Sequence, residues 1–429
     1  MKMKKTFLIV LLVMLIVLNI SVVCFSEEIT LNFVWWGGQD RADKTLKVVE
    51  LFEKKYPNVK FETQFFSWND YWEKLAVLVA SGELPDIVQQ EIQYISGYGE
   101  RGLLLNLDPY VEDNRLNLTD ASESEISGGK VNGKLYGVNS GSNCLSIVYD
   151  PELFKKAGVE EPTPEWTWED FIEKFKKIHD VLKIYGIDIY DINTDNTQAF
   201  EFYLRQHGQD FYDEFAKKLG YEDDKLFVDY FNMIYDLSKY GAIVPVQISS
   251  AIGHSVFDEY LITKQEAAAI GMSSNMIVAL DEAAASRPLN LMIFPNAKEQ
   301  VRYGSTIRPS QFFSVAKNSK HPEWAVKFVD FLTNDFEANK ILLGERGVPI
   351  SSKVRESIKP YLNDVQKKHI DYIGMAVKYS YPYKQIYPLA HSQIVDLLRV
   401  TYEKMLYNEL TPEKAAKEFR EKANKILAE

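Results

Sequence analysis

An alternation of short apolar strands with amphipathic helices, starting at residue 29, is the feature that most constrains the fold. Residues 29–36 alternate in hydropathy, and Gly37-Gly38 predicts a tight turn directly after this strand. A helix over about residues 42–56, stopped by Pro57, should follow, and residues 59–65 have the pattern of a second strand.

The alternation continues beyond the second strand. Residues 71–80 are expected to be helical, and a third strand begins within residues 85–88. Strands that alternate with helices form parallel sheets covered by helices, so the sequence predicts an α/β domain with a largely parallel sheet. Two later helices are predicted, one after an N-cap at Thr167 and one opened by Pro322.

The first residues have the composition of an export signal. A basic start precedes an apolar run over residues 7–18, which is short for a membrane span and is followed by small residues. We expect a signal peptide over residues 1–26, cleaved after Ser26, and an exported protein that is periplasmic or extracytoplasmic. The alternative is a lipid anchor on Cys24.

Length, charge and motif content narrow the function. A chain of 429 residues normally forms two or more domains, and a formal net charge of −12 argues against a nucleic-acid partner. Cys144 has no partner once the signal is removed, so no intrachain disulfide is expected. The six histidines show no metal-ligand spacing, and residues 253–257 lack the closing glycine of a nucleophile elbow. We therefore expect no metal, no cofactor and no catalytic residue.

Eight segments, read in order, resemble the family 1 extracellular solute-binding proteins of ABC importers, the group that includes maltose-binding protein. The segments are 35–38 (WWGG), 51–60 (LFEKKYPNVK), 81–88 (SGELPDIV), 134–138 (KLYGV), 149–158 (YDPELFKKAG), 167–171 (TWEDF), 315–323 (VAKNSKHPE) and 347–350 (GVPI). The resemblance implies a two-lobe periplasmic-binding-protein fold of the type II kind, in which two α/β lobes close on a ligand about a hinge. It also implies an oligosaccharide as the ligand, the permease subunits of an ABC importer as partners, and a monomer.

The resemblance also implies where the lobes meet. Carried onto this chain, the three crossings fall near residues 139–143, 307–313 and 346–350. The amino-terminal lobe would then comprise residues 27–139 and 311–345. The carboxy-terminal lobe would comprise residues 140–310 and 346–429.

Three loops of the first lobe are candidates for binding, because ligands of open parallel sheets lie beyond the carboxyl ends of the strands. Aromatic rings suit the flat faces of sugars, and carboxylate or amide groups can span two adjacent hydroxyls. The alternatives are that the tryptophan pair belongs to the core, that Asp70 caps a helix, and that the third loop is merely exposed. The candidates are Trp35, Trp36, Gln39, Asp40 and Arg41 in the first loop, Trp68 and Asp70 in the second, and Gln90 and Glu91 in the third.

Arg41 has two interpretations. It either pairs locally with Asp40 or Asp43, or it points into the cleft as a fork of donors for sugar hydroxyls or for a uronate carboxylate. The second interpretation makes an acidic oligosaccharide the second choice of ligand, after a neutral one.

The second lobe offers two further segments. Met272, Ser273 and Ser274 follow an apolar run, at a position that resembles the family loop that offers an aromatic ring to the sugar. A proline-interrupted loop near the carboxyl terminus contributes three tyrosines, for which ordinary packing is the alternative. These tyrosines are Tyr381, Tyr383 and Tyr387.

The sequence thus predicts a non-enzymatic sugar-binding protein. The alternative is a secreted glycoside hydrolase or polysaccharide lyase, since two facing carboxylates are enough for hydrolysis and the chain has 61 acidic residues. A structural surface protein would show repeats or low-complexity linkers, and the sequence contains neither.

Overall fold

The structure, a computed structural model, describes residues 28–428 except 190–197, 253–256, 286, 383–386 and 389. The expected signal segment, with Ser26 and Cys24, therefore lies outside the described residues, as does Tyr383. Within the described ranges, no helix is both long and apolar enough to cross a membrane.

Five strands form the first sheet, in the order β2-β1-β3-β12-β6. β1 lies parallel to β2 and β3, whereas β12 runs antiparallel to β3 and β6. The prediction of a largely parallel sheet is therefore wrong for β12, because this strand arrives from the second lobe and enters at the carboxyl edge of the sheet, without a crossover helix. The strands are β1 (Ile29–Trp36), β2 (Val59–Phe66), β3 (Ile87–Gln90), β12 (Phe312–Val315) and β6 (Val138–Asn139).

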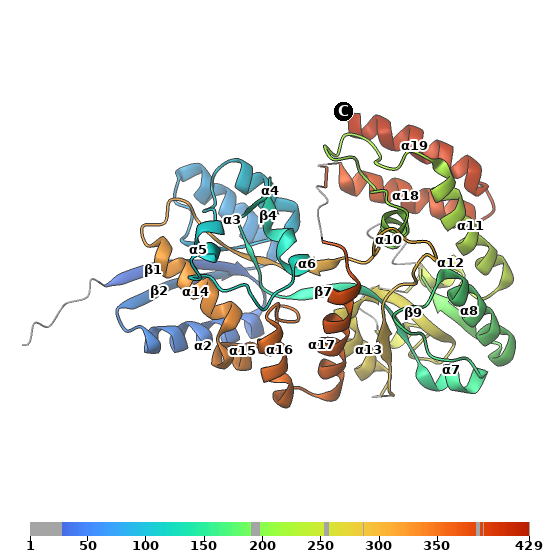
Figure 1. Ribbon diagram of the computed structural model, residues 1–429, viewed down its shortest axis with the longest axis horizontal. Helices are drawn as coiled ribbons and strands as arrows, with labels where there is room; N and C mark the ends of the chain where they lie inside the picture. The colour runs from blue at the N-terminus through green and yellow to red at the C-terminus, as the bar shows by residue number, and fades with distance from the viewer. Residues whose placement is uncertain are drawn as a thin grey trace, which may run out of the picture.

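Helices cover both faces of this sheet (Figure 1). α2 and α14 pack on the face that carries Trp35, and α3 and α4 pack on the face that carries Trp36. Successive residues of a strand point to opposite faces, which separates the tryptophan pair. The elements beside the sheet are α2 (Gln39–Lys55), α3 (Trp68–Ser81), α4 (Ile92–Glu100), α5 (Asp108–Glu112), α6 (Glu123–Ile126), β4 (Lys130–Val131), β5 (Lys134–Leu135), α14 (Pro322–Asn334) and α15 (Phe336–Leu342).

The second sheet has the order β10-β7-β9-β8, and β11 also pairs with β7. β7 runs antiparallel to its three partners, and only β8 and β9 are parallel among these strands. Its strands are β7 (Ser142–Tyr149), β8 (Tyr185–Asp188), β9 (Ala267–Ser273), β10 (Asn290–Met292) and β11 (Ile307–Pro309). Its helices are α7 (Pro151–Ala157), α8 (Trp168–Leu182), α10 (Gln198–Gln206), α11 (Asp224–Tyr240), α12 (Val246–Ser249), α13 (Ile277–Ala283), α16 (Ser352–Ile358), α17 (Asp364–Ala376), α18 (His391–Leu406) and α19 (Pro412–Ala428).

Local capping signals set several helix starts. Thr167 caps α8 as predicted, and Asp170 completes a capping box by accepting from the Thr167 backbone N–H at 2.8 Å. Pro322 opens α14, also as predicted. The first two helices each begin three residues earlier than expected, at Gln39 and Trp68, because Gly38 and Ser67 are the N-cap residues.

Three chain segments meet between the two sheets, and Figure 1 shows β7 leading from this crossing into the second lobe, with α16 and α17 below it. The Ser142 N–H donates to the Val348 carbonyl at 2.7 Å, and the Val348 N–H donates back at 3.2 Å. A Cβ on Gly141 would lie only 2.2 Å from the Arg346 carbonyl oxygen, so the close approach needs glycine there. These segments lie within the predicted crossings, while the exact lobe boundaries stay predictions.

Candidate functional site

Five aromatic rings gather where β1 and β2 end, and we call them the aromatic cluster: Trp36, Trp68, Tyr71, Trp72 and Tyr94. Trp36 meets Trp68 edge to face with ring centroids 5.0 Å apart, and Trp72 stacks on Tyr94 at 3.9 Å. Trp68 is 43% exposed and Tyr94 is 38% exposed, whereas Trp36 is buried beneath them. The cluster therefore presents partly exposed rings at the carboxyl edge of the first sheet.

The start of α3 positions this cluster. Ser67 caps the helix by accepting from the Asp70 N–H, and the Ser67 hydroxyl lies 2.5 Å from an Asp70 carboxylate oxygen. Residues four apart share one face of a helix, which brings Trp68 and Trp72 together. Tyr71 points inward and donates to the Gln89 carbonyl at 2.6 Å, so this hydroxyl anchors the helix to β3.

Beside the cluster, Glu91 caps α4. Its carboxylate accepts from the Gln93 N–H at 2.7 Å. Burial raises the pKa of Glu91, while the Gln93 hydrogen bond and the charge of Arg308 act to lower it. A carboxylate at a helix N-terminus satisfies free N–H groups there, so the capping bond already occupies part of this side chain.

Arg308 is the middle residue of β11 and is exposed between its buried neighbours Ile307 and Pro309. Burial, with a contribution from the nearby Arg308 charge, lowers the pKa of His391 at the start of α18 to about 4. Arg308 therefore lies within electrostatic reach of both Glu91 beside the first sheet and His391 in the second lobe.

Tyrosines surround His391 on the second-lobe side. The Tyr212 hydroxyl lies 2.8 Å from His391 Nδ1, and the Tyr387 ring packs on the imidazole with centroids 4.1 Å apart. Tyr381 receives the Arg302 guanidinium over its ring at 4.6 Å. Tyr381 and Tyr387 are both half-buried. Two of the three predicted tyrosines therefore pack against neighbouring side chains and remain partly accessible to solvent.

A set of paired charges holds the crossing together, and we call it the hinge network: Arg41, Glu345, Arg346, Glu125 and Arg355. Arg41 Nε donates to Glu345 at 2.6 Å, and Arg346 pairs with the same glutamate at 3.2 Å. Burial lowers the pKa of Arg346 to about 9, and the Glu345 charge opposes that shift. Arg41 and Arg346 line a cavity of about 270 Å³ together with His369 of α17.

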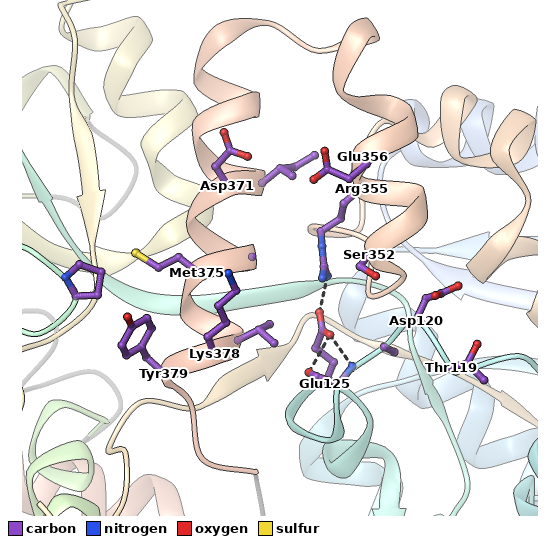
Figure 2. Close-up of a pocket in the computed structure, with 16 residues that line it drawn as sticks. Thr119, Asp120, Glu125, Ser352, Arg355, Glu356, Asp371, Met375, Lys378 and Tyr379 are labelled. Atoms are coloured by element: carbon purple, nitrogen blue, oxygen red, sulfur yellow. Dashed lines mark hydrogen bonds and ion pairs between the residues drawn. The ribbon is translucent and has the colours of Figure 1, made fainter.

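A larger cavity of about 720 Å³ lies between α6, α16 and α17. Figure 2 shows Arg355 of α16 pointing toward Glu125 of α6, with Asp371 and Met375 of α17 on the opposite wall. Arg355 donates to Glu125 at 2.7 Å, and both side chains are buried. Lys359 pairs with Asp371. Most charged groups here therefore form ion pairs with one another, which is typical of a contact that stabilises the fold.

Four predicted ligand residues are buried or engaged by contacts within the protein. Trp35 is fully buried in the core, where its ring centroid lies 4.7 Å from that of Phe33. Met272 is also buried, and Ser274 Oγ lies 3.0 Å from His369 Nε2 under α17. Arg41 has donors engaged by Glu345 and by the Trp36 carbonyl, so the expected local pair with Asp40 or Asp43 is wrong. Its contact with a ligand stays a prediction.

The remaining predicted ligand residues differ in exposure and in hydrogen bonding. Gln39 donates to Asp43 at 2.7 Å, and Asp40 pairs with Lys44 at 2.9 Å, both along the exposed side of α2. Gln90 is fully buried, with no hydrogen-bond partner for its amide among the described residues. Ser273 is half-buried and donates to Asn275 at 2.7 Å.

The sequence analysis did not single out three residues that lie in this region. Trp72 follows Trp68 by one helical turn, and Tyr94 follows Glu91 by three residues, so helix spacing could have found both. Arg308 lies inside a predicted crossing, as a charged residue between apolar neighbours. In the described part of the chain, no group of three His, Cys, Asp or Glu side chains is arranged to hold a metal ion.

Comparison with known proteins agrees with this architecture. The family model described as "Bacterial extracellular solute-binding protein" matches residues 38–336. The arabinooligosaccharide-binding protein of Bacillus subtilis (strain 168) is 26% identical over 310 residues, covering 69% of this chain and 67% of that protein.

Two solved structures confirm the predicted two-lobe α/β fold. An extracellular solute-binding protein of family 1 from Alicyclobacillus acidocaldarius is 29% identical, with a TM-score of 0.86 over 94% of this chain and 100% of that chain. A periplasmic oligogalacturonide binding protein from Yersinia enterocolitica is 24% identical, with a TM-score of 0.79 over 93% of this chain and 99% of that chain. At this identity the second likeness concerns the fold alone.

Proposed function

This chain belongs to the bacterial extracellular solute-binding proteins, the family predicted from its sequence, and from that premise we propose that it binds an oligosaccharide outside the cytoplasm. The bound sugar would be delivered to the permease subunits of an ABC importer. The proposal accords with the names of its relatives, among them the arabinooligosaccharide-binding protein of Bacillus subtilis.

The observation that carries the proposal is the aromatic cluster. Sugar rings have apolar C–H faces, and exposed indole and phenol rings pack on such faces while sugar hydroxyls reach polar neighbours. Trp68 and Tyr94 supply the exposed rings, and Asp70 and Glu91 supply nearby carboxylates. Trp68 and Tyr94 both pack against Trp72, so the cluster offers more than one ring to a ligand, which favours an oligosaccharide over a monosaccharide.

Capture would use closure of the two lobes. The crossing segments meet at Gly141 and Gly347, and a few residues of this kind can absorb the backbone rotation of a hinge. Closure would bring Tyr387 and His391 of the second lobe toward the aromatic cluster of the first. Water would leave both surfaces, and the ligand would be held between them.

We propose binding without turnover. Hydrolysis needs a proton donor and a second carboxylate placed on either side of the glycosidic bond. Of the carboxylates beside the aromatic cluster, Glu91 caps α4 and Asp70 contacts Ser67. Incubation of the protein with its ligand for a day should return the sugar unchanged, and shortened or unsaturated products in excess of the protein would identify an enzyme.

The proposal includes export. Cleavage after Ser26 would release a monomer, and acylation of Cys24 would instead tether it to the membrane. Intact mass of the protein purified from its native host distinguishes the two forms, because a diacylated species would begin at Cys24.

A thermal-shift screen of residues 27–429 against neutral and acidic oligosaccharides tests the function. A ligand that binds only the folded protein raises the melting temperature by mass action. Small-angle scattering with that ligand should then show a smaller radius of gyration. Failure of all sugars to raise the melting temperature would contradict sugar binding, and an unchanged radius would contradict closure.

A further inference from the structure

We infer that the Arg308 guanidinium binds a carboxylate of the sugar, so that the preferred ligand is an acidic oligosaccharide containing a uronate unit. The inference rests on the proposed sugar-binding function and adds the chemical class of the ligand. It places on β11 the role that the sequence suggested for Arg41.

Arg308 lies exposed on the short strand β11, where the two lobes meet. In β11 the side chains of Ile307 and Pro309 are buried, and Arg308, which points to the other face of the strand, is exposed. Its backbone pairs in register with Asn143 of β7, so Arg308 lies at the crossing where the chain passes between the two lobes. A ligand held by both lobes would pass over this position.

The positive charge of Arg308 is not bound by a carboxylate of the described residues. Among the described residues, the Arg308 side chain has no ion pair and no side-chain hydrogen bond, whereas Arg41, Arg346 and Arg355 are all paired with glutamates. An arginine guanidinium carries five N–H donors in a planar fork that matches a carboxylate in two parallel bonds. These donors are free to meet a ligand.

The neighbouring groups leave this charge available. Glu91 is the acidic group whose pKa Arg308 influences, but the Glu91 carboxylate accepts a hydrogen bond from the α4 backbone and forms no ion pair with Arg308. On the other side lies His391, which is neutral at pH 7 because its pKa is lowered to about 4. A ligand carboxylate would therefore meet a guanidinium that no carboxylate of the described residues binds directly, although Glu91 lies within its electrostatic reach, and one such guanidinium suits one uronate unit.

Two disaccharides that differ only at C6 provide the test: digalacturonate, which carries carboxylates, and α-1,4-galactobiose, which carries hydroxymethyl groups. Titration calorimetry measures both with the wild-type protein, Arg308→Gln and Arg308→Lys. The control is Arg101→Gln, which removes an exposed charge at the far end of α4. Melting temperatures of the unliganded variants should match the wild type, because Arg308 is exposed and unpaired.

The wild type should prefer digalacturonate, and Arg308→Gln should lower that affinity by roughly tenfold to a hundredfold, the range for hydrogen bonds to charged groups. Affinity for galactobiose should change by less than about threefold, Arg308→Lys should fall between, and added salt should reduce the preference. Equal binding of both sugars by the wild type, or an unchanged preference in Arg308→Gln, would overturn the inference. Galactobiose binding in those cases would leave the proposed function standing.

Discussion

The hinge network and the surface formed by the aromatic cluster with Arg308 lie beside the same crossing strands. They differ in whether their charged and aromatic side chains are paired and buried or exposed to solvent. In the hinge network, Arg41, Arg346 and Arg355 are paired with glutamates and largely withdrawn from water. On the other surface, Trp68 is 43% exposed and the Arg308 side chain has no ion pair among the described residues.

This difference indicates which residues hold the protein together and which remain available to a ligand. A buried charge must be paired, and removing its partner leaves a large desolvation cost in the folded state. An exposed ring or an exposed cation costs the unliganded protein little and gains its contacts only on binding. Substitutions in the two regions should therefore separate, with stability affected in the first and affinity in the second.

Loss of the Arg355–Glu125 pair should have the largest effect. Arg355→Met leaves Glu125, which is fully buried, without its cation. Urea unfolding should show a loss of about 3–5 kcal/mol in the free energy of unfolding, while ligand affinity of the folded protein stays the same. Lys353→Met is the matched control, because Lys353 pairs with Asp120 but is 80% exposed and should have little effect. Similar losses in both variants would contradict the distinction.

Arg41→Ala tests directly whether Arg41 stabilises the hinge network or binds the ligand. The Arg41 and Glu345 side chains are 18% and 12% exposed, so the free energy of unfolding should fall by about 1–3 kcal/mol. Affinity for sugar should be unchanged, which is the reverse of the result expected for Arg308→Gln. Lys44→Ala, on the exposed side of the same helix, is the control. A tenfold loss of affinity at an unchanged melting temperature would return Arg41 to the binding site.

His369 makes the stability of the hinge side depend on pH. Burial lowers its pKa to about 4 in the folded protein, below the ordinary value near 6.5 in the unfolded chain. Between these values the unfolded chain binds the extra proton, so stability falls as pH drops from 6.5 toward 4, by up to about 1.4 kcal/mol per pH unit. His369→Gln keeps a donor for Ser274 and should make this slope shallower between pH 6.5 and 5, and the part that remains includes the contribution of His391, whose pKa is also lowered to about 4. An identical slope in both proteins would assign the dependence to other groups.

Much of the fold was predictable because its signals are local. The alternation of β1, the capping box at Thr167 and the proline at the start of α14 each lie within a few residues of the element they define. The direction of β12 was not predictable in this way, since the strand pairs with β3 across more than 200 residues of chain.

The site was predicted less well, because contacts distant in sequence decide which side chains remain free. Arg41 pairs with a glutamate 304 residues away, and Ser274 is covered by a histidine 95 residues away. Neither contact leaves a trace in the local pattern. Trp68 and Glu91 do follow the ends of strands as predicted, because that property depends only on the order of the elements, and their contact with a ligand stays a prediction.

Trp68→Ala should give the smallest effect of these changes, confined to binding. The ring is partly exposed and touches Trp36 and Trp72 at its edge, so its removal should lower oligosaccharide affinity by roughly 1 kcal/mol, about fivefold, with a small change in melting temperature. Trp68→Phe should recover part of the affinity, because it keeps an apolar face. Phe215→Ala is the control, since Phe215 is an exposed ring outside the aromatic cluster. Titration calorimetry with the best ligand of the thermal-shift screen measures all three variants. If Trp68→Ala binds like the wild type while its melting temperature falls sharply, the cluster is a packing feature of α3, and the distinction between the two regions would then rest on Arg308 alone.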